Sequence, residues 1–150
     1  MAIEAIQRLT GTPNVHEFPE DGTDETFKNG DLVGLTTSGT VTIAATGKIL
    51  GIARRDATGV ANTQIPVDLI DTHSDFSAPL TSGETAAQTI VGDERSFVFT
   101  AGAQTLSADA GTDCVVIALD GRSLSGGNGV AGGRMVFRFQ GNLLDTPTGA

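Results

Sequence analysis

The sequence predicts an all-β fold, a small glycine-rich β-barrel or β-sandwich that follows an extended N-terminal arm. Three observations predict it. Apolar runs of four to seven residues alternate with glycine and serine, which is typical of short strands joined by tight turns. No periodic apolar pattern long enough for a regular helix is present. The 150 residues include 20 glycines, and the aromatic residues are seven phenylalanines, so the length suits one domain with a largely aliphatic core.

The arm is predicted at residues 1–28 and the β-domain at residues 29–150. Pro13 and Pro19 interrupt any continuous element in the arm, because proline lacks an N–H and restricts the residue before it. The segment nevertheless carries more apolar side chains than a solvated tail needs. These make it a candidate binding arm with the contact residues Ile3, Ile6, Leu9, Val15 and Phe18. A frayed terminus without a role is the alternative.

Strands are predicted in order after the arm. The first three form an antiparallel meander at residues 30–35, 40–45 and 49–53, with turns at 37–40 and 45–48. A fourth strand at residues 64–70 contains Pro66, which is tolerated at a sheet edge or a bulge. Further strands are predicted at residues 96–100, 114–119 and 134–140, while residues 82–91 fit either a helical turn or a loop that enters a strand.

The predicted strand 134–140 has two different faces. One face is expected to pack in the core and carries Met135, Phe137 and Phe139. Arg134 and Arg138 share the opposite face. Residues 122–150 hold three arginines and one aspartate, whereas the rest of the chain is strongly acidic. Arg134 and Arg138 are therefore predicted to contact an acidic surface of a neighbouring copy in a homo-oligomer.

Composition argues against several classes of function. Eighteen acidic and nine basic residues give a net charge of −9, which disfavours binding to nucleic acid or to an anionic membrane. No stretch has the length and apolarity of a membrane span or a signal peptide, so synthesis in the cytoplasm is expected. Cys114 is the single cysteine and forms no intramolecular disulfide. The fold must then depend on its core and, where that core is thin, on partner subunits.

The motifs that could carry chemistry lack the context they need. Residues 127–132 match G-x-G-x-x-G, but a strand pattern follows where a nucleotide-binding fold has a helix. Residues 109–114 and 121–125 resemble fragments of the trimeric dUTP pyrophosphatases, at the wrong spacing. A candidate cation site is formed by the carboxylate oxygens and the imidazole nitrogens of Asp68, Asp71, His73 and Asp75. Their spacing matches no EF-hand, and a solvated loop is the alternative. No cofactor and no catalytic residue is predicted.

Over residues 27–70 the segments F-K-N-G-D-L-V, T-V-T-I-A-A and G-K-I-L-G-I-A follow one another. In this order, and in its glycine-rich texture, the chain resembles the capsid decoration, or cement, proteins of tailed bacteriophages. The resemblance implies a non-enzymatic virion protein, made in the host cytoplasm. Such a protein binds the outer capsid surface as a homo-oligomer, typically a trimer, and clamps neighbouring subunits of the major capsid protein.

Two other functions stay open beside this resemblance. One is a dUTP-pyrophosphatase-like β-fold enzyme, which the two short fragments suggest. The other is a glycan-binding β-sandwich, which the absence of Trp and Tyr weakens, because flat aromatic rings are the usual platforms for sugar rings.

Overall fold

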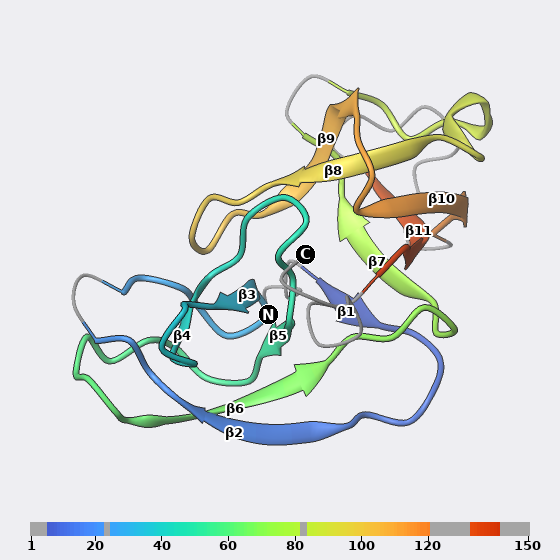
Figure 1. Ribbon diagram of the computed structural model, residues 1–150. Coiled ribbons are helices and arrows are strands. Elements are labelled where there is room, and N and C mark those ends of the chain that lie inside the picture. The colour runs from blue at the N-terminus through green and yellow to red at the C-terminus, as the bar shows by residue number, and fades with distance from the viewer. Residues whose placement is uncertain (1–5, 23–24, 82–83, 121–132, 142–150) are drawn as a thin grey trace.

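Two antiparallel sheets make up the protein and confirm the all-β prediction (Figure 1). The computed structural model describes residues 6–22, 25–81, 84–120 and 133–141. The six-stranded sheet has the order β1 (Gln7–Arg8), β7 (Phe76–Pro79), β11 (Arg134–Phe139), β10 (Cys114–Leu119), β8 (Glu94–Val98) and β9 (Thr105–Ala110). The five-stranded sheet has the order β2 (Val15–Pro19), β6 (Gln64–Leu69), β5 (Gly51–Ala53), β3 (Leu32–Leu35) and β4 (Val41–Ile43). The arrangement is compatible with a small β-sandwich.

The five-stranded sheet curls toward closure. Glu20, which follows β2, forms a parallel bridge with Val41 of β4, and the N–H of Asp21 donates to the Val41 carbonyl at 3.1 Å. Because β2 and β4 are the outer strands in the hydrogen-bonded order, this bridge brings the two ends of the sheet together. The curled sheet has its own buried core, made of Phe27, Val33, Val41, Leu50, Ala53, Ile65 and Val67.

A larger core joins the two sheets. It combines Leu32 and Ile52 of the five-stranded sheet with apolar side chains of the six-stranded sheet. Met135, Phe137 and Phe139 are buried in it, which confirms the face predicted to pack. Phe139 meets Phe76 and Phe137 edge to face, with ring centroids 4.9 Å and 5.0 Å apart. Aromatic pairs of this kind stabilise a core beyond the area that they bury.

All the strands predicted for residues 29–150 are present, with ends at most two residues from the predicted ones. β7 and β9 were not predicted. β7 is only four residues long, and β9 has one fully buried residue among its six, so neither shows a clear apolar alternation. A short 3-10 helix, η1 (Gln88–Ile90), lies in the region left open between a helical turn and a loop. Within the described residues no helix is long and apolar enough to cross a bilayer.

Pro66 lies in a central strand and not, as predicted, at an edge or a bulge. β6 is flanked by β2 and β5, and β5 ends at Ala53, which pairs with Val67. The N–H of Arg54 donates to the Pro66 carbonyl at 2.8 Å. Proline is tolerated here because its missing N–H falls just past the end of β5, where the ladder does not require a donor.

The predicted N-terminal arm is built into both sheets over residues 6–22. β1 pairs with β7 of the six-stranded sheet, and β2 pairs with β6 of the five-stranded sheet. The two prolines do not prevent this, because Pro13 lies between the strands and Pro19 is the last residue of an outer strand, where a lost N–H is tolerated. In its described part the segment therefore links the sheets and does not stand apart from the domain.

Candidate functional site

The segment that follows β1 and includes the first three residues of β2 is exposed on the surface of the molecule. Every residue from 9 to 17 is exposed, and we call this stretch the 9–17 connection. Leu9 and Val15 are 43% and 49% exposed, which places two large apolar side chains in solvent on one short stretch. The stretch is anchored at both ends, since Ile6 is fully buried in the larger core and Phe18 packs against the core of the five-stranded sheet.

Hydrogen bonds hold the 9–17 connection against the neighbouring 71–75 turn. The N–H groups of Leu9 and Thr10 donate to the Asp75 carbonyl at 2.8 Å and 3.3 Å, and the Asp75 N–H donates to Thr10 Oγ1 at 2.8 Å. Gly11 has a φ of +81°, and a Cβ on it would clash with Ser74 Oγ. The positive φ and the lack of space for a Cβ both require glycine at position 11. The connection therefore has a fixed path over the surface.

A buried arginine fixes the start of the connection. Arg8 Nε and Nη2 donate to the two carboxylate oxygens of Asp68 at 3.0 Å and 2.9 Å, and Nη1 donates to Asp71 Oδ2 at 3.1 Å and to Ser74 Oγ at 3.0 Å. The guanidinium carbon lies 4.8 Å from the centre of the Phe76 ring. This one side chain thus links β1 to β6, to β7 and to the turn between them.

The electrostatics of the cluster depend on Asp68, whose side chain is fully buried. Burial alone would raise the pKa of Asp68, but the hydrogen bonds from Arg8 and from the Asn14 N–H outweigh it and hold the pKa below its usual range. Burial likewise opposes the charge of Arg8, but its hydrogen bonds to Asp68 and Asp71 outweigh burial and raise the pKa of Arg8. The pair is therefore ionised at neutral pH.

The three aspartates of the candidate cation site bind arginine side chains. Asp68 and Asp71 bind Arg8, and Asp75 Oδ1 accepts a hydrogen bond from Arg138 Nε at 2.7 Å. His73 is exposed, and its N–H donates to Asp71 Oδ1. Among the described residues no three His, Cys, Asp or Glu side chains gather in a way that could hold a metal ion. Guanidinium groups supply the positive charge that these carboxylates need.

The predicted contact residues fall into two groups. Leu9 and Val15 are exposed, whereas Ile6 and Phe18 serve as anchors in the cores, and Ile3 lies outside the described residues. The prediction that Ile6 contacts a partner is wrong, because Ile6 has no exposed surface. Its place at the start of a strand that pairs in the sheet could not be read from the short apolar pattern.

The prediction that Arg134 contacts a neighbouring copy in a homo-oligomer is also wrong. Arg134 is 9% exposed, and its Nε and Nη2 donate to Ser77 Oγ at 3.0 Å and to the Ser77 carbonyl at 3.1 Å. Asp120 Oδ2 lies 3.6 Å from Arg134 Nε. Because these polar groups surround the guanidinium inside the fold, it cannot reach a neighbouring copy. The Arg138 side chain is 48% exposed and paired with Asp75 of its own chain.

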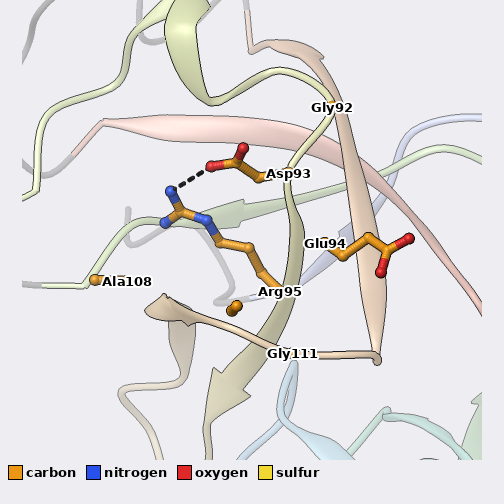
Figure 2. Close-up of a pocket in the computed structure, with 7 residues that line it drawn as sticks. Gly92, Asp93, Glu94, Arg95, Ala108 and Gly111 are labelled. Carbon is orange, nitrogen blue, oxygen red and sulfur yellow. Dashed lines mark hydrogen bonds and ion pairs between the residues drawn. The ribbon is translucent and has the colours of Figure 1, made fainter.

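A hollow of about 520 Å³ lies where β8 begins and β9 ends, and we call it the acidic hollow (Figure 2). It is lined by Gly92, Asp93, Glu94, Arg95, Ala108, Ala110 and Gly111. Figure 2 shows the Asp93 carboxylate turned toward the Arg95 guanidinium and the Glu94 side chain pointing away from that pair. Asp109 is exposed between two of the lining alanines. Glu94 lines the hollow, whereas the Asp109 side chain lies on the other face of β9, because side chains alternate along a strand.

Arg95 forms the floor of the acidic hollow and is 5% exposed. Its Nη1 donates to Glu84 at 2.7 Å and to the Ser107 carbonyl at 3.0 Å, and its Nη2 donates to Asp93 at 3.0 Å. Burial would lower the pKa of Arg95, but the hydrogen bonds to Glu84 and Asp93 outweigh it and raise the pKa. Glu84 and Asp93 bind this guanidinium, and Glu94 adds a third carboxylate to the lining of the hollow. Three negative charges thus stand beside one positive charge, so the hollow suits a cationic group.

The other motifs contribute no site in the described residues. Within the 109–114 fragment, Asp113 is 6% exposed and accepts a hydrogen bond from the Gly47 N–H at 2.8 Å, which joins a turn of each sheet. The 121–125 fragment and the G-x-G-x-x-G string at 127–132 lie outside the described residues. Comparison of the chain with models of protein families and with curated proteins finds no match.

Proposed function

We propose that the protein is a non-enzymatic structural protein of a virion. In this proposal it binds the outer surface of a tailed-bacteriophage capsid as a homotrimer and clamps neighbouring subunits of the major capsid protein. The observation that carries the proposal is the 9–17 connection, which exposes Leu9 and Val15 while both of its ends are anchored in buried cores. The proposal calls for no cofactor, nucleic acid or membrane.

A fixed connection suits a clamp because little conformational entropy remains to be lost on binding. The ion pair of Arg8 with Asp68 and the close approach of Gly11 to Ser74 hold the backbone before the partner arrives. Three copies of such a contact on one trimer would act together. Linking them raises the effective concentration of the second and third contacts and increases affinity by about 10²–10⁴ over a single one.

Capsid binding tests the proposal directly. Purified protein is mixed with expanded capsids that lack a decoration protein, the capsids are sedimented, and the bound fraction is measured against protein concentration. We expect saturable binding by the wild type and a loss of affinity of about tenfold or more for the double variant Leu9→Ser/Val15→Ser. Val98→Ser is the matched control, since Val98 is 39% exposed on β8, which β7, β11 and β10 separate from β1 in the six-stranded sheet.

The proposal fails if the wild type does not bind the capsids at all. The 9–17 connection is excluded as the contact if the double variant binds as the wild type does, or if the Val98 control loses as much affinity. Circular dichroism of each variant confirms that the sheets are intact, so that a loss of binding is not a loss of fold.

A further inference from the structure

The loops at one end of the five-stranded sheet carry more basic than acidic side chains in an otherwise acidic protein. Residues 27–30 and 54–63 meet there, because the Asn29 N–H donates to Asp56 Oδ1 at 2.8 Å and the Ala57 N–H donates to the Phe27 carbonyl at 2.9 Å. We call these two segments the loop end. They contain three basic residues and the single acidic residue Asp56. Lys28 and Arg55 are exposed.

The tip of the loop end is held in one shape by a buried carboxylate. Glu20 is fully buried, and its two oxygens accept hydrogen bonds from the Thr58 N–H at 3.0 Å, Thr58 Oγ1 at 2.7 Å and the Gly59 N–H at 2.6 Å. The tip then exposes Val60 by 61%, more than any other large apolar side chain of the described residues. Residues 57–63 contain no charged side chain.

Two carboxylates near this end, those of Glu20 and Asp31, are turned inward, whereas Asp21 is exposed beside the tip and accepts a hydrogen bond from Thr40 Oγ1 at 2.7 Å. Asp31 is 1% exposed and accepts hydrogen bonds from the Lys28 N–H at 2.9 Å and from the Gly102 N–H at 2.8 Å. Like Glu20, Asp31 accepts hydrogen bonds from backbone N–H groups inside the fold. Within residues 27–30 and 54–63 the exposed surface combines Lys28, Arg55 and the apolar tip with the one carboxylate of Asp56, so these two segments differ in charge from the rest of a chain with a net charge of −9.

The acidic hollow has the complementary character and lies at the other end of the molecule. Figure 1 shows the start of β8 far from the loop between β5 and β6. Asp93 and Glu94 line the hollow and are exposed, and its volume of about 520 Å³ leaves room for side chains of a partner. A basic, apolar end and an acidic hollow are thus present on one chain without being able to meet within it.

We propose that copies of this protein associate head to tail, with the loop end of one copy, at Arg55, Lys28 and Val60, docked on the acidic hollow of the next copy. Two chains with a net charge of −9 repel each other in most orientations. This orientation places positive charge on negative charge and buries Val60, so attraction replaces repulsion. A heterologous contact of this kind closes into a ring when the rotation between copies fits and builds an open chain when it does not, and the ring is the case that the trimer of the proposed function requires.

Charge exchange tests the contact. The masses of the wild type, Arg55→Glu, Glu94→Arg and the double variant Arg55→Glu/Glu94→Arg are measured by sedimentation velocity over a range of protein concentrations. Each single variant should dissociate at a concentration about tenfold or more above that of the wild type, because it places like charges opposite each other. The double variant should reassemble, because the two charges have changed places and opposite charges again face each other across the contact.

Lys48→Glu is the control for net charge. It makes the same change as Arg55→Glu at an exposed position outside both surfaces, and its assembly should match that of the wild type. The contact is overturned if the single variants assemble normally, if the double variant does not recover, or if the control dissociates equally. It is also overturned if the wild type stays monomeric; a monomer that still binds capsids would retain the capsid binding of the proposed function and overturn its trimer.

Discussion

Replacing Arg8 by methionine should destabilise the protein strongly, because it leaves a buried carboxylate without its main partner. The side chains of Arg8 and Asp68 are 5% and 0% exposed, and two hydrogen bonds of 2.9 Å and 3.0 Å join them. Removing one partner of a buried ion pair costs about 3–5 kcal/mol. Arg54 Nη2 remains 3.1 Å from Asp68 Oδ2, which favours the lower end, about 3 kcal/mol.

Urea unfolding at neutral pH, followed by far-UV circular dichroism, measures this loss as a lower midpoint at an unchanged slope. Arg138→Met is the matched control. It removes an arginine that also forms an ion pair, to Asp75 at 2.7 Å, but that arginine is 48% exposed. A surface pair of this kind contributes about 0–1 kcal/mol, so the control should stay close to the wild type.

A second variant separates the buried charge from the lost packing. In Arg8→Met/Asp68→Asn the uncompensated carboxylate is gone, so the double variant should be more stable than Arg8→Met alone. The reasoning is refuted if Arg8→Met costs no more than Arg138→Met. It is also refuted if removing the Asp68 charge from the Arg8→Met background makes the protein less stable.

Three further predictions concern other buried groups. Burial raises the pKa of Asp113, so Asp113→Asn should raise Tm at neutral pH, where the wild-type carboxylate is charged. This gain in Tm should disappear as the pH falls through the raised pKa, because the wild-type carboxyl group then takes up a proton. A gain in Tm that persists in acid contradicts this. Glu20→Ala leaves the Thr58 and Gly59 donors without their acceptor and should cost about 1–3 kcal/mol, with faster amide exchange at both residues; unchanged exchange would show that the loop does not depend on Glu20. Gly51→Ala should unfold the five-stranded sheet at lower urea, because its Cβ would clash with the Asp68 carbonyl oxygen, whereas Gly141→Ala, with open space around it, should not; equal midpoints for the two variants would contradict this.

The strands could be predicted from sequence where burial follows a simple pattern. Cys114–Leu119 is a continuous apolar run, and Arg134–Phe139 alternates, so both were found with correct or nearly correct ends. β9 could not be found in this way, because most of its residues are at least partly exposed and its pairing with β8 sustains it. Pairing across the chain leaves no local pattern when neither face of the strand is apolar.

The role of the N-terminal segment was harder to predict than its apolar content. Ile6 and Phe18 were predicted to contact a partner, but Ile6 is fully buried in the larger core, and Phe18 is partly buried and packs against the core of the five-stranded sheet. A short apolar pattern has the same appearance whether it packs inward or outward. The deciding contact is the pairing of Arg8 with Asp68, which lie 60 residues apart, and long-range ion pairs leave no signal in a single sequence.

The internal use of carboxylates also explains how a strongly acidic chain can offer surfaces for association. Glu20, Asp31, Asp68 and Asp113 are buried and accept hydrogen bonds from donors inside the fold, so their charge is not spread over the surface. The two proposed contacts then differ in physical kind. Docking of the loop end on the acidic hollow is ionic at its rim and should weaken as salt screens it. Contact through Leu9 and Val15 is apolar, and a kosmotropic salt such as sulfate should strengthen it.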